Sequence, residues 1–191
     1  MIWTIGHSNH SARRFIDLLQ GAGIDCVADV RSAPFSRRNP QFSQKALTAS
    51  LKDAGIEYWF LGDALGARPT DADCYEGGKA SYARIAATAA FQEAIHGLID
   101  GSHARRIALM CAEKEPLECH RTVLVGRALA QRDTELAHIH ADGRIEPQAA
   151  LEERLLHLAK EKVDLLNGRD AALAQAYDKL GKRMAYDSAD R

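Results

Sequence analysis

The stretch from Ile107 to Arg127, IALMCAEKEPLECHRTVLVGR, decides the fold predicted for this chain. Its first four residues form an apolar run without alternation, which is typical of a buried strand. A polar loop with Pro116 follows, and an apolar helical pattern begins after His120. The stretch therefore predicts a strand, a loop and the start of a helix. Two thiols, an imidazole, a guanidinium and two carboxylates gather at this turn, and we expect the function to involve them.

The rest of the chain repeats the order of strand and helix. Further apolar runs predict strands at residues 1–5, 26–30, 56–61 and 136–140. Helical patterns predict helices at residues 11–23, 43–55 and 81–100, the last of which could break near Thr88, and from the opening stretch to about residue 131. This alternation predicts an α/β fold: a single three-layer domain with a mostly parallel sheet of about five strands and helices on both faces.

The region after the last predicted strand reads as helical. Pro147 suits the first turn of a helix that reaches about Leu166. The carboxylate of Asp170 can cap a final helix that runs through Leu180. From Asp187 onward we expect a frayed tail.

We therefore divide the chain at residue 145. Residues 1–145 are expected to form the α/β domain, and residues 146–191 a C-terminal helical extension packed on or beside it. Within the domain, residues 62–78 are rich in glycine and acidic residues, which predicts a long irregular excursion.

Composition and charge exclude several classes of protein. The 191 residues are 46% hydrophobic and 27% charged, with a formal net charge of −1, so neither global disorder nor a strongly basic nucleic-acid-binding body is expected. No apolar run reaches the roughly 18 residues of a membrane span and no export signal opens the chain, so we expect a cytoplasmic protein without a membrane partner. The four cysteines are expected to be reduced, with a disulfide between Cys111 and Cys119 as a lesser alternative.

Polar residues recur where the predicted strands end. In open α/β sheets, ligands bind beyond the carboxyl ends of the strands, so these side chains are expected to share one cleft. Strand by strand, they are His7 and Ser8, then Asp29 and Arg31, then Cys111 and Glu113, then His140.

With these segments assigned, the chain resembles the family called domain of unknown function 488. The matching stretches are TIGHS at Thr4–Ser8, DVRSAPFSRRNPQF at Asp29–Phe42, GIEYWFLGDALGARP at Gly55–Pro69 and ALMCAEKEPLECHR at Ala108–Arg121. The resemblance covers roughly residues 1 to 140 and implies no assigned reaction. One departure is that the family usually has a Gly-Gly pair where this chain has Gly66-Ala67, which leaves the backbone geometry of that loop open.

The two cysteines of the opening stretch are the first candidates for catalysis. Cys119 lies near a predicted helix start, where unpaired amides, Arg121 and a protonated His120 would favour its thiolate. Cys111 ends a strand and could react, resolve a disulfide or be an inert buried residue. The alternative for Cys119 is likewise a small residue that packs against the helix.

A zinc site is a weaker alternative. Cys111, Cys119, His120 and His7 are suitable donors. They lack the compact spacing of common zinc motifs, and neighbouring Cys119 and His120 would need an awkward shared geometry.

Arginines near the strand ends are candidates for binding an anion. Arg31, Arg37, Arg38 and Arg121, with the helix amides after Pro116, could hold a phosphate or carboxylate, and Ser8 is a further candidate for binding the substrate. The alternative is that Arg31 forms a structural ion pair with Asp29 and that Arg37 and Arg38 are solvated. His7 could act as a general acid, base or ligand, with Asp29 orienting it or Arg31, and Glu113 could accept a proton.

These residues support three hypotheses. The first is an enzyme that acts on a small anionic or nucleotide-like substrate, with Cys119 or Cys111 as thiolate and with His7, Glu113 or His120 moving protons. The second is a non-catalytic module that binds a nucleotide or, less favoured by the net charge, nucleic acid. The third is a metal-binding protein. No cofactor, reaction class or oligomeric state follows from the sequence.

Overall fold

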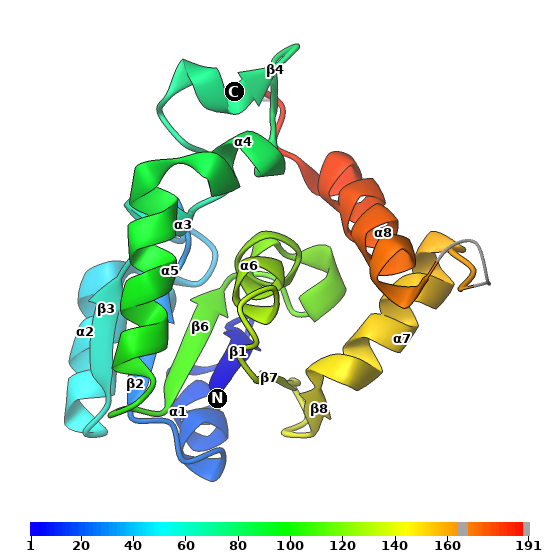
Figure 1. Ribbon diagram of the computed structural model, residues 1–191. Coiled ribbons are helices and arrows are strands. Elements are labelled where there is room, and N and C mark those ends of the chain that lie inside the picture. Colours follow the sequence, from blue (N-terminus) through cyan, green and yellow to red (C-terminus); the bar gives the residue numbers. More distant parts are fainter. Residues whose placement is uncertain (164–167, 189–191) are drawn as a thin grey trace.

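The computed structural model describes residues 1–163 and 168–188, and in them one sheet organises the fold (Figure 1). Its six strands lie in the order β3-β2-β6-β1-β7-β8. Five of them run parallel, as predicted: β1 (Ile2–Gly6), β2 (Cys26–Asp29), β3 (Glu57–Phe60), β6 (Ile107–Cys111) and β7 (Leu136–Ile139). A parallel sheet with helices on both sides confirms the predicted α/β class.

The sixth strand, β8 (Ile145–Pro147), was not predicted. It pairs antiparallel with β7 at the edge of the sheet. Three residues are too few to show the period-two pattern that reveals a strand in sequence. Pro147 therefore ends this strand instead of occupying the first turn of the next helix, for which it is the N-cap.

The helices cover both faces because strand side chains alternate between them. Along β6, Ala108 and Met110 pack toward α1 (Ala12–Gly21) and α2 (Gln44–Asp53). Ile107 and Leu109 pack on the opposite face, toward α5 (Ala89–Gly101) and α6 (Arg127–Ala130). Burial on both faces explains why the strand reads as a continuous apolar run.

Two local predictions about helices are confirmed. Ser11 caps α1, because its hydroxyl accepts a hydrogen bond from the backbone N–H of Arg14. The predicted break occurs at Thr88, whose hydroxyl caps α5 and separates it from α4 (Tyr82–Ala87).

The excursion at residues 62–78 is more regular than predicted. It contains the short helix α3 (Gly62–Leu65), a 3₁₀ turn η2 (Ala72–Cys74) and strand β4 (Tyr75–Glu76). Strand β4 forms a hairpin with β5 (Lys79–Ala80). The two residues of the turn, Gly77 and Gly78, both have positive φ, a conformation that glycine adopts readily in tight hairpin turns.

The helix predicted after β6 has an unusual form. A 3₁₀ turn η3 (Pro116–Glu118) comes first, followed by a π-helical segment η4 (Arg121–Gly126) that continues into α6. π-Helical turns are rare and occur frequently at functional sites. The position of this helix was predicted correctly, but its type was not.

The C-terminal helices differ in their bounds from the prediction. Helix α7 (Gln148–Ala159) stops at Lys160, which has a left-handed conformation, and the predicted end near Leu166 lies outside the described residues. Helix α8 (Arg169–Met184) starts after Gly168, so Asp170 lies in the first turn and is not the cap. Both helices pack on each other and around Leu117 and Val123 of the segment after β6.

The end of the described chain is attached to the hairpin. Asp187 pairs with Lys79, and the N–H of Ser188 donates to the carbonyl of Gly78 at 2.9 Å. Figure 1 shows the chain leaving α8 and passing to β4. The predicted fraying is therefore wrong for residues 187 and 188, because they pair with backbone, while residues 189–191 lie outside the described part.

Among the helices of the described residues, none combines the length and the apolar character needed to cross a bilayer.

Candidate functional site

A cleft of about 1040 Å³ opens at the carboxyl ends of β1, β2 and β6. The ends of the strands, the loop at residues 31–39, the segment after β6 and the end of α8 all line it. The C-terminal extension, to which the sequence assigned no role, thus contributes residues 183–187 to one wall. Of the predicted site residues, those that line the cleft are His7, Ser8, Arg31, Arg37, Arg38, Cys111, Glu113, Cys119 and His120.

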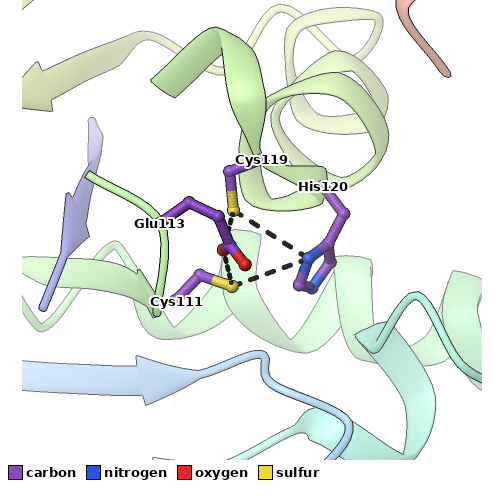
Figure 2. A group of neighbouring side chains, drawn as sticks. All are labelled: Cys111, Glu113, Cys119 and His120. Atoms are coloured by element: carbon purple, nitrogen blue, oxygen red, sulfur yellow. Dashed lines mark hydrogen bonds between the residues drawn. The ribbon is translucent and has the colours of Figure 1, made fainter. Parts of the chain in front are cut away.

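Four of these residues meet in one cluster, which we call the Cys-Glu-His cluster: Cys111, Glu113, Cys119 and His120 (Figure 2). One donor atom from each lies within 4.8 Å of all the others. The Oε2 atom of Glu113 lies 2.9 Å from the Sγ of Cys111 and 3.0 Å from the Sγ of Cys119. The four cysteines of the chain are all free thiols in this structure, so the Cys111–Cys119 disulfide is not formed.

A hydrogen bond to the backbone fixes the orientation of the His120 ring. Its Nε2 lies 2.8 Å from the carbonyl oxygen of Val30, which can only accept, so Nε2 carries the hydrogen and donates it. Its Nδ1 faces the cluster, 3.6 Å from the Sγ of Cys111 and 3.9 Å from the Sγ of Cys119. Val30 directly follows β2, so the backbone at the end of this strand positions the side chain of His120, which belongs to the segment after β6.

The two thiols of the cluster differ in acidity. Burial opposes the ionisation of Cys119, but the hydrogen bond with Cys111 and the charges of Arg121 and His120 outweigh it and hold the pKa of Cys119 well below its ordinary value. Burial and the neighbouring Cys119 raise the pKa of Cys111 well above its ordinary value. These shifts favour ionisation of Cys119 over ionisation of Cys111, and a reactive thiolate on Cys119 stays a prediction.

The charge of a thiolate on Cys119 affects the pKa of Glu113 and the pKa of His120. Burial of the carboxylate and the charge of Cys119 raise the pKa of Glu113, although much of this residue is exposed to solvent. Burial disfavours protonation of His120, but its interactions with Cys119 outweigh burial and raise the pKa of the imidazole. A proton can thus be shared among groups that lie within hydrogen-bonding reach of one another.

The backbone of the loop after β6 is held tightly. A Cβ on Gly6 would lie 1.9 Å from the carbonyl oxygen of Glu113, so only glycine permits this approach. The buried Arg121 donates from Nη1 to the carbonyl of Glu113 at 2.7 Å and from Nη2 to that of Lys114 at 3.2 Å. Arg121 does not line the cleft, so the structure places it behind the loop and not against a bound anion.

Three other predicted residues form a second buried group, the His-Asp-Arg group: His7, Asp29 and Arg31. Arg31 donates from Nε and Nη2 to the two oxygens of Asp29, at 2.9 and 2.6 Å. Tyr58 donates to Asp29 Oδ2 at 2.8 Å, and Arg31 also donates to the carbonyl of Phe42. This is the structural ion pair that the sequence analysis gave as the alternative role for Arg31.

His7 completes the second group. Its Nδ1 lies 2.8 Å from the carbonyl of Ser8 and its Nε2 lies 3.2 Å from Nη1 of Arg31. Burial lowers the pKa of His7 to about 4, so the ring is neutral near pH 7. Both ring nitrogens are occupied by these two hydrogen bonds. Its ring stacks on Phe42 at 4.3 Å, and the adjacent Ser8 has a positive φ and lines the cleft.

The rim of the cleft carries positive charge. Arg37 and Arg38 are exposed on the loop at residues 31–39, and the exposed Phe35 precedes them. Arg68 and Arg183 also line the cleft, and the sequence analysis selected neither. Arg68 lies within Gly55–Pro69, one of the stretches that carry the family resemblance, so it could have been predicted as a site residue on that ground. No sequence pattern around Arg183 indicates a site residue.

His140 lies apart from this cleft. His140 was predicted to share the cleft with the other strand-end residues, but its Nε2 is 2.8 Å from Glu146 Oε2, and it does not line the cleft.

Comparison with known families agrees with this picture. The model of the family described as Domain of unknown function DUF488 matches residues 11–128, which include the loop with Arg37 and all four residues of the Cys-Glu-His cluster. No curated protein matches the chain, and no solved structure matches it. Because the match spans more than half of the 191 residues, the chain belongs to the DUF488 family.

Proposed function

We propose that the protein is an enzyme that acts on a small anionic or nucleotide-like substrate, with the Cys-Glu-His cluster as its reactive centre. One observation carries this proposal: two buried cysteines, an acid and an imidazole meet in the lining of a cleft whose rim carries four arginines. Perturbed titrating groups that converge in a large cleft are typical of active sites.

The size and charge of the cleft support a small anion. Its volume of about 1040 Å³ lies just above the usual range of ligand pockets, about 300 to 1,000 Å³, which leaves room for a nucleotide-sized molecule. Guanidinium groups bind phosphate and carboxylate with two parallel hydrogen bonds. In the proposed complex Arg37, Arg38, Arg68 and Arg183 would hold the anion, while Arg31 and Arg121 maintain the walls through internal hydrogen bonds.

The residues of the cluster would have separate roles. Cys119 supplies the thiolate, which can either attack an electrophile or ligate a metal. Glu113 is the proton acceptor or donor, because its carboxylate contacts both thiols. We do not assign proton transfer to His7, because both of its nitrogens are engaged.

The binding part of the proposal is tested with inorganic pyrophosphate as the probe, by calorimetry on the full chain. The double variant Arg37→Ala/Arg38→Ala should bind it at least about 10-fold more weakly, since each charged hydrogen bond contributes roughly 1.5–3 kcal/mol. Arg13→Ala, which removes an exposed arginine paired with Asp17 in α1, is the matched control and should bind normally. Equal affinity in both variants would refute anion binding at the rim.

The catalytic part is tested by turnover of small phosphate and carboxylate esters. Cys119→Ser should reduce turnover by at least about 100-fold, because a serine hydroxyl is not ionised near pH 7. Cys74→Ser is the control, since Cys74 is buried and free but lies outside the cluster. Full turnover in Cys119→Ser would exclude this cysteine from the reaction.

A second candidate, a non-catalytic nucleotide-binding module, is favoured by Phe35. This side chain is 69% exposed and precedes Arg37 and Arg38 on the rim. An exposed aromatic ring beside arginines can stack on a base while the cations hold a phosphate. Binding of adenosine monophosphate that weakens in Phe35→Ala, without turnover of any ester, would support this candidate over the enzyme.

A further inference from the structure

We infer that the Cys-Glu-His cluster binds one divalent zinc ion through the sulfurs of Cys111 and Cys119, the Nδ1 of His120 and the carboxylate of Glu113 (Figure 2). This inference deepens the proposed function, because it names the cofactor of the same centre and rests on the proposed cleft for its access to substrate.

The spacing of the donor atoms carries the inference. In tetrahedral zinc sites with bonds of about 2.0 to 2.3 Å, donor atoms lie about 3.3 to 3.8 Å apart. The two sulfur-to-Nδ1 distances of His120, 3.6 and 3.9 Å, are close to this range. The two sulfur-to-Oε2 distances of Glu113, 2.9 and 3.0 Å, are shorter, so a bound ion would push the carboxylate outward by roughly half an ångström.

The imidazole is prepared for ligation. Metal-bound histidines commonly donate their second N–H to a carbonyl or carboxylate, which fixes the ring and its tautomer. His120 does this through Nε2 and the carbonyl of Val30, and the remaining Nδ1 points at the two sulfurs. The geometry that seemed awkward for adjacent residues is achieved because Cys119 has an extended backbone and His120 a helical one.

The surroundings stabilise thiolate ligands. The backbone N–H of Arg121 donates to the Sγ of Cys119 at 3.4 Å. The guanidinium of Arg121 fixes the carbonyls of Glu113 and Lys114, and so fixes the loop that carries the fourth donor. Two thiolates, one carboxylate, a divalent ion and one guanidinium sum to zero formal charge, which suits a buried site.

The donor set selects the ion. Two sulfurs and one imidazole favour zinc over magnesium or calcium, which prefer oxygen ligands. Cys111 and Cys119 are buried, but Glu113 is exposed toward the cleft. Exchange of Glu113 for water or substrate would leave three protein ligands and one open position, which is the arrangement of catalytic zinc sites. His7, which the sequence analysis named as a donor, is not a member, because both of its nitrogens are bonded elsewhere.

Metal content of the full chain tests the inference. Protein loaded with zinc under reducing conditions and dialysed against metal-free buffer should retain about one zinc ion per chain, measured by mass spectrometry of the digested sample. Cobalt in place of zinc should give the visible bands of tetrahedral Co²⁺ and a near-ultraviolet thiolate charge-transfer band. Cys119→Ser should lose both signals, and Cys74→Ser should keep them.

Glu113→Gln provides the sharper variant, because it preserves size and removes only the charge. It should retain zinc less well by about 10-fold or more in competition with a chelator, while the cobalt charge-transfer band persists. Wild-type protein that retains less than about a tenth of an ion per chain, with both cluster thiols free to react with a thiol reagent, would overturn the inference, and this result does not depend on any variant folding.

The two proposals fail in different ways. Protein that binds pyrophosphate through Arg37 and Arg38 but holds no zinc would refute the metal site and leave the anion cleft intact. Protein that holds zinc but shows neither pyrophosphate binding nor turnover would refute the proposed function and leave the metal site intact.

Discussion

Two buried polar groups lie at the same edge of the sheet, and they are built differently. In the His-Asp-Arg group, Asp29 and Arg31 are 0% and 5% exposed, and their hydrogen-bonding atoms have partners with opposite character. In the Cys-Glu-His cluster, one potential ligand atom from each of four groups lies within 4.8 Å of the others. The first arrangement is complete without a ligand. We propose that a cation completes the second.

This difference teaches how to separate a structural polar group from a functional one. Both groups follow strand ends and both contain residue types that catalyse reactions, so residue type does not distinguish them. The distinguishing feature is the balance of donors and acceptors. Asp29 accepts from the cationic guanidinium of Arg31 and from the hydroxyl of Tyr58, whereas the carboxylate of Glu113 accepts only from the thiols of Cys111 and Cys119 among the contacts of the described residues.

The largest expected effect comes from breaking the first group. Asp29→Asn leaves the guanidinium of Arg31 buried without its counter-charge and should lower the free energy of unfolding by about 3–5 kcal/mol. Chemical denaturation measures it. Glu76→Gln, which breaks the exposed pair with Arg84, should change stability by less than about 1 kcal/mol. A loss below about 1 kcal/mol for Asp29→Asn would show that the two groups do not differ as described.

The next effect comes from moving the loop that carries the cluster. Gly6→Ala places a Cβ against the carbonyl of Glu113, so the loop must shift, and we expect a loss of about 3 kcal/mol together with the loss of bound zinc. Denaturation and metal analysis measure the two parts. Gly21→Ala, in α1 with open space around it, should be neutral or stabilising. Retention of zinc in Gly6→Ala would mean that the cluster tolerates a displaced loop.

His138, a buried polar residue outside both groups, sharpens the comparison through pH. Its Nδ1 lies 2.9 Å from Thr4 Oγ1 and its Nε2 lies 2.9 Å from Gln148 Oε1, so it is satisfied as a neutral ring. Burial, reinforced by the charge of Arg121, outweighs the hydrogen bond to Gln148 and lowers the pKa of His138 to about 4.

The sign of the pH effect follows from proton binding. In the unfolded chain His138 binds a proton below its ordinary pKa of about 6.5, while the folded protein does not bind it until the pH nears 4. Stability therefore falls as the pH decreases through this window, by about 1.6 kcal/mol between pH 6.5 and pH 5 for this residue. Denaturation at several pH values measures the free energy of unfolding as a function of pH. Between pH 6.5 and pH 5 this free energy should fall less in His138→Asn than in the wild type, by the same amount. An equal fall in both proteins would contradict the assignment.

The sequence predicted the parallel strands because burial on both faces leaves a signature in residues such as Ile107 to Met110, which need no distant partner to be read. It missed β8 because that strand exists only through its pairing with β7. The π-helical form of η4 was also missed, since its residues read as an ordinary apolar helix. Local sequence pattern therefore predicts the order of strands and helices, whereas a strand such as β8 depends on its pairing in the folded chain.

For the candidate site, the sequence selected Cys111, Cys119 and His120 because ligands bind at strand ends in this class of fold, and the structure brings these three residues together. It could not choose Glu113 over His7 as the fourth member of the cluster. That choice depends on the path of a loop, which the close approach to Gly6 and the hydrogen bonds of Arg121 determine. Arg183 was beyond prediction, because α8 brings it to the cleft from far along the chain.

The smallest expected effect on stability comes from the cluster itself and completes the contrast with Asp29. In the described part of the chain, the carboxylate of Glu113 contacts sulfur atoms and is not paired with a cation. Glutamine keeps an oxygen that can accept from the same thiols, and the residue is partly solvated, so Glu113→Gln should change the free energy of unfolding of metal-free protein by less than about 1 kcal/mol. Denaturation in the presence of a chelator measures this. The same variant should lose zinc affinity and turnover, because a neutral amide is a poor ligand and a poor base. A loss of more than about 2 kcal/mol without metal would instead make Glu113 a structural residue like Asp29, since residues retained for a ligand are expected to add little to the stability of the empty fold.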